Sequence, residues 1–312
     1  MPLDPRVQAF LQAAQAASTP IHEQTPEQAR QEMLAQTHML GPGEAVANVT
    51  DASLPGPGGD IPIRIYQPDV RTPSPCLVYF HGGGFVIGSI DTHDGMCRAM
   101  ANGAGIIVIS VDYRLAPEHK FPAAVDDAYA ATCEIIRRAE QLGIDPQRVA
   151  VGGDSAGGNL AAVVALMARD RKGPELAMQL LLYPVTDANL ETRSYLEYAE
   201  GYMLTREAMG WFWNHYLTDP AEREHVYASP LRAADLSKLP PALVITAECD
   251  PLCDEGDAYA ERLKQAGVRV AYTCYPGMIH GFIRRAKVLQ DGRKALEQIS
   301  QALRATLAPE TI

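Results

Sequence analysis

The chain has 312 residues, of which 47% are hydrophobic and 21% are charged. This composition is typical of a soluble globular protein and excludes collagen-like, fibrous and mainly disordered chains. The 38 acidic residues outnumber the 27 basic ones, and the net charge of −11 argues against nucleic acid and anionic membrane surfaces as partners.

The expected cellular compartment follows from two patterns that we do not find in the sequence, a secretion signal and a membrane span. Residues 1–18 do not combine a basic segment with an apolar stretch, and the longest apolar run, 160–168, is too short for a membrane span. Of the six cysteines only Cys249 and Cys253 lie close, without the spacing usual in zinc or redox motifs. We therefore expect buried thiols and a cytoplasmic protein. A homodimer is compatible with the sequence, which contains no signal that fixes the oligomeric state.

Residues 1–40 carry the pattern of two amphipathic helices. Val7 and Leu11 share one face of the first helix, and Thr25 and Gln28 form a capping box that opens the second. After them, residues 45–66 have weaker strand patterning around a turn rich in proline and glycine. This segment predicts two antiparallel edge strands.

From Cys76 onward, short apolar runs alternate with helical patterns. Such alternation predicts an α/β fold, in which a mostly parallel sheet carries helices on both faces through right-handed crossovers. The expected strands lie at 76–80, 106–111, 149–153, 180–184, 242–246 and 270–275. The expected helices lie at 92–103, 121–140, 155–171, 255–266 and 290–307.

One interval breaks this alternation. Almost sixty residues separate the runs at 180–184 and 242–246, far more than a βα loop needs, so an inserted substructure is expected. Residues 195–227 contain both tryptophans, a density that suggests a lid over a pocket. The candidates for lining an acyl pocket are Leu204, Met209, Trp211 and Phe212. The alternative is a helical insert that uses these side chains as its own core.

The segment Gly153-Asp154-Ser155-Ala156-Gly157 stands between a predicted strand and a predicted helix. In that context G-x-S-x-G predicts a nucleophile elbow, in which Ser155 occupies a strained turn at a helix N-terminus. We expect Asp154 to anchor this region through hydrogen bonds. The alternative is a glycine-rich turn with an incidental serine.

His81 and three glycines, residues 82–84, follow directly after the predicted strand 76–80. Consecutive glycines expose backbone N–H groups, which suits a loop that donates hydrogen bonds to an oxyanion. Combined with the elbow, this is the arrangement of lipases and esterases, in which the N–H after the nucleophile, here that of Ala156, is a further donor. His81 is expected to order the loop.

The general base and its acid must follow Ser155 in the order Ser, Asp, His. Of the eight histidines His280 fits best, because it follows a predicted strand in a short loop, whereas His215 and His225 lie in the insert. Asp250 comes directly after a predicted strand and is the first choice for the acid, with Asp254 in reserve. The acid would accept the Nδ1–H of the histidine.

Taken together, these motifs resemble the hormone-sensitive lipase family of bacterial carboxylesterases, in the branch that carries Gly-Asp-Ser-Ala-Gly at the elbow. The segments that carry the resemblance are 81–89, 92–94, 112–118, 152–159, 250–256 and 280–282.

The resemblance implies an α/β-hydrolase fold. Its catalytic domain would be residues 41–184 and 230–312, and its helical cap residues 1–40 and 185–229. It further implies the triad Ser155, Asp250 and His280, and an oxyanion hole formed by Gly83, Gly84 and Ala156.

The expected activity is hydrolysis of carboxylic esters with short to medium acyl chains through an acyl-enzyme, without a metal or other cofactor. Amide hydrolysis, a long-chain lipase and a receptor without turnover are the alternatives. An intact Ser, Asp, His set argues against the receptor. The acidic composition and the lack of a membrane-binding helix argue against the long-chain lipase.

Overall fold

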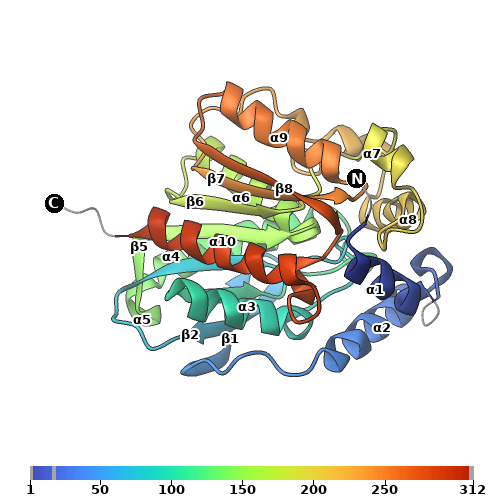
Figure 1. Cartoon of the computed structure of the whole chain (residues 1–312). Coiled ribbons are helices and arrows are strands. Elements are labelled where there is room, and N and C mark those ends of the chain that lie inside the picture. The colour runs from blue at the N-terminus through green and yellow to red at the C-terminus, as the bar shows by residue number, and fades with distance from the viewer. Residues whose placement is uncertain (1–2, 16–18, 309–312) are drawn as a thin grey trace.

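The computed structural model describes residues 3–15 and 19–308, and its centre is an eight-stranded sheet (Figure 1). The strand order is β1-β2-β4-β3-β5-β6-β7-β8. Strands β1, β2 and β4 pair antiparallel, and all other neighbours pair parallel, so the predicted mostly parallel α/β sheet is confirmed. The strands are β1 (Asn48–Gly56), β2 (Gly59–Gln67), β3 (Ser74–Phe80), β4 (Ile107–Val111), β5 (Ile144–Asp154), β6 (Met178–Leu182), β7 (Ala242–Cys249) and β8 (Val270–Ile279).

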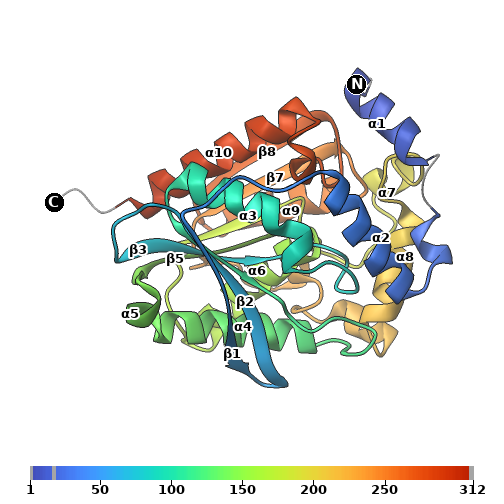
Figure 2. The same cartoon turned by 90° about the horizontal axis from the view of Figure 1, so that it is seen from below.

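Helices cover both faces of the sheet, as Figure 2 shows. Helices α3 (Ile90–Ala104) and α10 (Gln290–Leu307) pack on one face. On the other face lie α4 (Ala123–Arg137), α6 (Ala156–Asp170) and α9 (Cys253–Gln265), and the short α5 (Ala139–Leu142) follows α4. The two layers bury inner parallel strands such as β3 and β6 on both sides, which explains why these strands are continuous apolar runs in the sequence.

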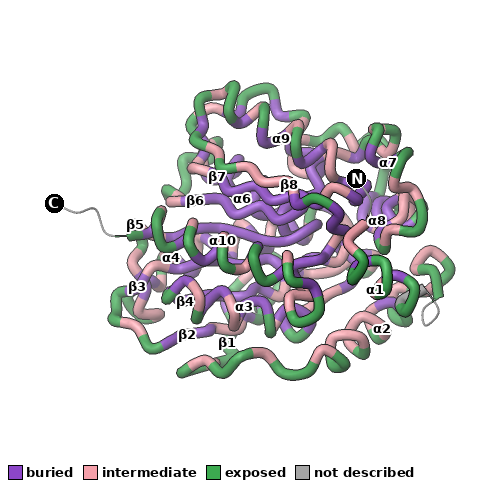
Figure 3. Tube along the Cα trace, viewed as in Figure 1, coloured by how far each residue is buried: buried purple, intermediate pink, exposed green. Residues whose placement is uncertain are grey.

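Burial follows this layering (Figure 3). All positions of β4 and β6 are buried, and α6 is buried from Ala156 to Ala168 because it lies between the sheet and neighbouring helices. Helix α10 buries only one stripe, which includes Ile299 and Leu303, and exposes its other side.

The N-terminal helices and the insert lie together at one end of the molecule, near the carboxyl ends of the parallel strands (Figure 1). They comprise α1 (Pro5–Gln15), η1 (Ile21–Glu23), α2 (Pro26–Met39), α7 (Arg193–Glu197), α8 (Arg206–Tyr216) and η2 (Pro220–Glu224). The predicted capping box is confirmed: Thr25 Oγ1 accepts from Gln28 N, and Gln28 Oε1 accepts from Thr25 N. The remaining short 3-10 helices are η3 (Pro230–Arg232) and η4 (Ile283–Arg285).

One detail of the strand prediction is wrong. Strand β1 is an edge strand as expected, but β2 lies inside the sheet because its other side pairs with β4, from Ile63↔Val111 to Tyr66↔Val108. Its three fully or nearly fully buried apolar residues, Ile61, Ile63 and Tyr66, reflect that position.

The ranges expected for the cap and the catalytic domain, 1–40 and 230–312, include residues 1–2, 16–18 and 309–312, which lie outside the described residues. Across the part of the chain that is described, no helix has the length and apolar character needed to cross a bilayer.

Candidate active site

Ser155 stands at the sharp turn between β5 and α6. Its backbone has φ 54° and ψ −119°, a strained conformation for a residue other than glycine. The turn is held by hydrogen bonds from Ser155 N to Leu182 O at 2.8 Å and from Val185 N to Ser155 O at 3.1 Å. A side chain at Gly157 would overlap the carbonyl group of Phe80, so the small neighbours of the serine allow α6 to approach β3 closely.

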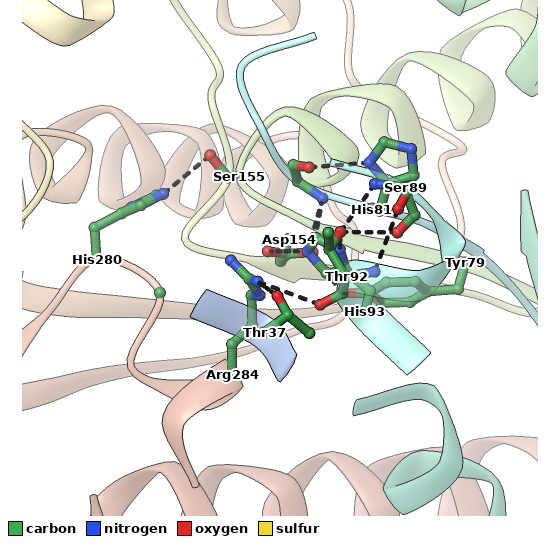
Figure 4. Close-up of polar contacts among 12 residues, drawn as sticks. Thr37, Tyr79, His81, Ser89, Thr92, His93, Asp154, Ser155, His280 and Arg284 are labelled. Atoms are coloured by element: carbon green, nitrogen blue, oxygen red, sulfur yellow. Dashed lines mark hydrogen bonds and ion pairs between the residues drawn. The ribbon is translucent and has the colours of Figure 1, made fainter. Parts of the chain in front are cut away.

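The side chains of Ser155, His280 and Asp250 form a continuous chain of hydrogen bonds. His280 Nε2 lies 3.0 Å from Ser155 Oγ, and His280 Nδ1 lies 2.7 Å from Asp250 Oδ2. Figure 4 shows the imidazole directed at the serine hydroxyl. Because the three residues follow β5, β8 and β7, they meet at the carboxyl edge of the sheet, where such sites assemble.

Asp250 is fully buried, and its position is fixed locally. Its Oδ1 atom accepts a hydrogen bond from Leu252 N at 3.0 Å, and its carbonyl accepts one from Cys253 N at 3.0 Å. The reserve candidate, Asp254, instead accepts a hydrogen bond from Ser194 N at 2.8 Å. Of the two carboxylates, only that of Asp250 contacts His280 in this structure.

The other candidate histidines lie in different surroundings. His215 Nδ1 is 2.9 Å from Trp211 O on its own helix, and His225 Nδ1 accepts from Tyr227 N at 3.0 Å. His81 is fully buried, stacks on the ring of Tyr113 at 4.3 Å between centroids, and has its Nδ1 atom 2.9 Å from Gly82 O. His81 therefore contacts the glycine loop, as the sequence predicts.

The glycine loop adopts a backbone that other residues rarely adopt. Gly83 and Gly84 have φ values of 127° and 57°, and a side chain at Gly84 would overlap the ring of Phe212 from α8. Ala156 is the first residue of α6, so its N–H has no acceptor within the helix. Gly83, Gly84 and Ser155 line one cavity, and Ala156 directly follows Ser155.

Asp154 ties the glycine loop to the elbow (Figure 4). Its buried carboxylate accepts hydrogen bonds from Gly82 N at 2.9 Å and from Tyr79 Oη at 2.6 Å, and it lies 3.2 Å from Nε2 of His93. Despite burial, the positive charges of His93 when protonated and of Arg284 hold the pKa of Asp154 well below its usual range. As expected, Asp154 thus anchors the elbow region, through Tyr79 of β3, Gly82 of the glycine loop and His93 of α3.

His93 leads to a prediction about the pH dependence of stability. Burial lowers the pKa of His93 to about 4, whereas an imidazole in an unfolded chain titrates near 6.5. Because the unfolded chain then binds the proton first, the free energy of unfolding should fall as the pH decreases from about 6.5 to about 4, by on the order of 2–3 kcal/mol from this group. Urea unfolding of the protein and of His93→Gln at both pH values measures the difference.

The exposed His38 supplies the control for that comparison, because His38→Gln removes an imidazole that is not buried. We expect His38→Gln to keep the pH dependence of the unsubstituted protein and His93→Gln to reduce it. An equal pH dependence in all three proteins would contradict the assignment.

A cavity of about 270 Å³ opens over Ser155 and His280. Its walls include the glycine loop, α2, the loop before α8 and α8 itself, with Leu204, Met209 and Phe212 among the lining residues. The lining found among the described residues does not include Trp211, whose ring packs against Phe212 and His215. Three of the four candidate pocket residues thus line the cavity, and the ring of the fourth contacts one of them.

Two residues that the sequence patterns did not single out, Arg30 and Asn159, hold elements around the site together. Arg30 of α2 pairs with Glu118 and donates to Val86 O and Ala116 O, so it fastens α2 to the loops beside the cavity. The amide of Asn159 donates to Val185 O and Ala228 O, which joins α6 to both ends of the insert. The signals in the sequence were the 112–118 motif, whose charged residues are expected to form structural ion pairs beside the site, and the 152–159 motif.

Within residues 3–15 and 19–308, no group of three or more His, Cys, Asp or Glu side chains is arranged to hold a metal ion. The arrangement around Ser155 supports nucleophilic acyl chemistry.

Comparison with known proteins agrees with this geometry. The sequence profile of the alpha/beta hydrolase fold matches residues 77–284. The chain is 39% identical to an ethyl acetate hydrolase of Pseudomonas putida, and the match covers 98% of this chain and all of the relative. It is 47% identical to a carboxylesterase of Mycobacterium tuberculosis, where the match covers 80% of this chain and 79% of the relative. The structure of a hyperthermophilic esterase from Pyrobaculum calidifontis superposes with a TM-score of 0.95 at 45% identity, covering 98% of this chain and 99% of that one. This chain belongs to the alpha/beta hydrolase fold family.

Proposed function

We infer that the chain is a serine carboxylesterase, which hydrolyses carboxylic esters of short to medium acyl length through an acyl-enzyme. The observation that carries this inference is the unbroken contact from Asp250 through His280 to Ser155 at the floor of a cavity. The esterases among its relatives support the same reaction class.

In the proposed mechanism, His280 removes the proton from Ser155 Oγ as that oxygen attacks the ester carbonyl. The N–H groups of Gly83, Gly84 and Ala156 then stabilise the oxyanion of the tetrahedral intermediate. The histidinium returns its proton to the leaving alcohol, which leaves an acyl-enzyme. Water, activated by the same imidazole, releases the acid and regenerates the serine.

Asp250 stays ionised in this scheme. Its carboxylate accepts the Nδ1–H of His280, which holds the tautomer that leaves Nε2 free to accept the proton of the serine. Edge-on contact with the ring of Tyr183, at 4.8 Å between centroids, further restricts the orientation of the imidazole.

The size and walls of the cavity support the substrate class. A volume of about 270 Å³ with Leu204, Met209 and Phe212 in its walls suits short to medium acyl chains better than long ones. We propose that residues 1–40 and 185–229 act as the cap over this cavity, and that the Gly-Asp-Ser-Ala-Gly elbow places the chain in the corresponding branch of the hormone-sensitive lipase family. A homodimer and a cytoplasmic location remain predictions.

The proposal is tested with nitrophenyl esters of rising acyl length, a matched nitroanilide, and an organophosphate. We expect kcat/KM to be highest for short to medium esters, and the organophosphate to leave a covalent adduct on Ser155 that mass spectrometry detects. Turnover at the background rate for every ester, together with no adduct, would remove the function altogether. Comparable rates for the anilide would favour the amidase alternative.

Substitution of Gly84 tests the oxyanion loop. A side chain there meets the ring of Phe212 and a backbone with φ of 57°, so Gly84→Ala should displace the donor and lower kcat roughly 10² to 10³-fold. Gly105→Ala is the matched control, because Gly105 has a similar φ of 65° but no atom within 4 Å of an added Cβ. Equal losses of kcat in the two variants would contradict the role of the loop.

A further inference from the structure

Two thiols that are far apart in the sequence meet beside the loop that contains Asp250. Cys253 is the first residue of α9, Cys274 lies in β8, and their Sγ atoms are 3.9 Å apart. Both are free and partly exposed, so the expectation of buried thiols is wrong for these two residues. In the sequence, by contrast, the two cysteines that lie close together are Cys249 and Cys253. The fold pairs Cys253 with Cys274 because β8 lies next to β7 and α9 begins just after β7.

The surroundings of the pair favour one thiolate. Hydrogen bonding from the Cys253 thiol, supported by the hydroxyl groups of Thr246 and Tyr272, lowers the pKa of Cys274 to about 7, although burial and the charge of Glu248 oppose the shift. The same hydrogen bond and burial raise the pKa of Cys253. These contacts favour the thiolate form of Cys274 next to a protonated thiol on Cys253.

The other four thiols differ from Cys274. Burial raises the pKa of all four, which are Cys76, Cys97, Cys133 and Cys249. Cys133 is partly exposed, whereas the other three are buried. Because the thiolate is the reactive form, Cys274 is the thiol of this chain best suited to oxidation. A partly exposed thiolate beside a second thiol is the arrangement of cysteines that sense oxidants.

We propose that Cys253 and Cys274 form a peroxide-sensitive pair, which closes to a disulfide and thereby lowers the turnover of the enzyme. The thiolate of Cys274 attacks a peroxide oxygen, which breaks the O–O bond and gives a sulfenic acid and, after protonation, water or an alcohol. The Cys253 thiol then attacks that sulfur and expels water. Overall, two thiols are oxidised and one peroxide is reduced, with both thiol protons ending in the products.

The link to turnover runs through the loop between β7 and α9. Closing the pair shortens the separation of the sulfurs from 3.9 Å to about 2.05 Å. Cys253 N donates to Asp250 O, and Leu252 N donates to the Asp250 carboxylate, so movement at the start of α9 reaches the acid that orients His280. Displacement on the order of 1 Å at such a site lowers kcat by about tenfold or more. This consequence rests on the proposed esterase function, whereas disulfide formation does not.

The first measurement is chemical. The purified, fully reduced chain is treated with a small excess of hydrogen peroxide, its remaining thiols are alkylated, and peptides are mapped by mass spectrometry. We expect a cross-linked peptide pair that contains Cys253 and Cys274, lighter by two hydrogen atoms than the separate peptides. Absence of that cross-link under conditions that oxidise any other cysteine would overturn the proposal.

The second measurement is kinetic, on the same samples. Turnover of a short nitrophenyl ester should fall about tenfold or more on oxidation, with KM nearly unchanged, and dithiothreitol should restore it. Cys274→Ser should resist inactivation, and Cys253→Ser should accumulate a sulfenic acid on Cys274 that dimedone traps.

Cys133→Ser is the matched control, because Cys133 is partly exposed but lies on α4 with a raised pKa. It should respond to peroxide like the unsubstituted chain. Inactivation of Cys274→Ser as fast as that of the unsubstituted chain, or a cross-link without any change in turnover, would overturn the regulatory step. If the reduced chain hydrolyses no ester, the proposed function fails while peptide mapping still decides whether the pair exists.

Discussion

Replacing Ser155 by alanine is expected to lower kcat for short-chain esters by about six orders of magnitude, to the level left by binding and the oxyanion donors. The reason is geometric as well as chemical. The strained turn, with φ of 54°, holds Oγ 3.0 Å from the imidazole. Steady-state hydrolysis of a nitrophenyl ester measures the loss.

Two comparisons make the Ser155→Ala result specific. Ser53→Ala removes an exposed hydroxyl on β1 and should leave kcat unchanged. An organophosphate should label the unsubstituted chain and Ser53→Ala but not Ser155→Ala. A Ser155→Ala protein that keeps its fold and a kcat within about tenfold of the unsubstituted chain would exclude an acyl-enzyme on this serine.

The second large effect is expected at Asp250. Asp250→Asn should lower kcat on the order of 10⁴-fold, because an amide stabilises the wrong tautomer of His280 and cannot balance the imidazolium that forms. The carboxylate is fully buried and lies 2.7 Å from Nδ1 of His280. Water therefore cannot compensate for the lost negative charge beside the imidazole. KM should change far less than kcat, since the substituted atom lies behind the imidazole.

Asp254 supplies a demanding control for this substitution. It stands four residues later in the same motif, but its carboxylate accepts a hydrogen bond from Ser194 N in the insert. Asp254→Asn keeps an oxygen acceptor and should retain kcat within about tenfold of the unsubstituted chain. The reverse ranking, a severe loss at Asp254 and a mild one at Asp250, would show that the wrong acid has been chosen.

Much of the fold follows from local patterns. Apolar runs such as 149–153 and 242–246 are continuous, which indicates strands buried on both faces, and β5 and β7 confirm this. The bounds of α10 agree with the expected helix because its apolar residues recur at helical spacing. The position of β2 inside the sheet was missed, since strand order depends on pairing between segments that are distant in the sequence.

The candidate site could be anticipated for a related reason. In a parallel sheet every strand ends at the same edge, so residues that directly follow strands are brought together whatever their separation along the chain. Ser155 and His280, 125 positions apart, come within hydrogen-bonding distance in this way. Their catalytic roles, and those of the oxyanion donors, remain predictions for the experiments above.

The amino-acid sequence by itself determined the alternation of strands and helices, the elbow around Ser155 and the order Ser, Asp, His, because side-chain periodicity and turn chemistry act over short stretches. Only the tertiary structure decided that Cys253 meets Cys274, that Phe212 lies against Gly84 and that Asp154 holds Gly82, Tyr79 and His93 together. Such contacts depend on how helices and strands distant in the sequence pack against each other, and no local pattern encodes that packing.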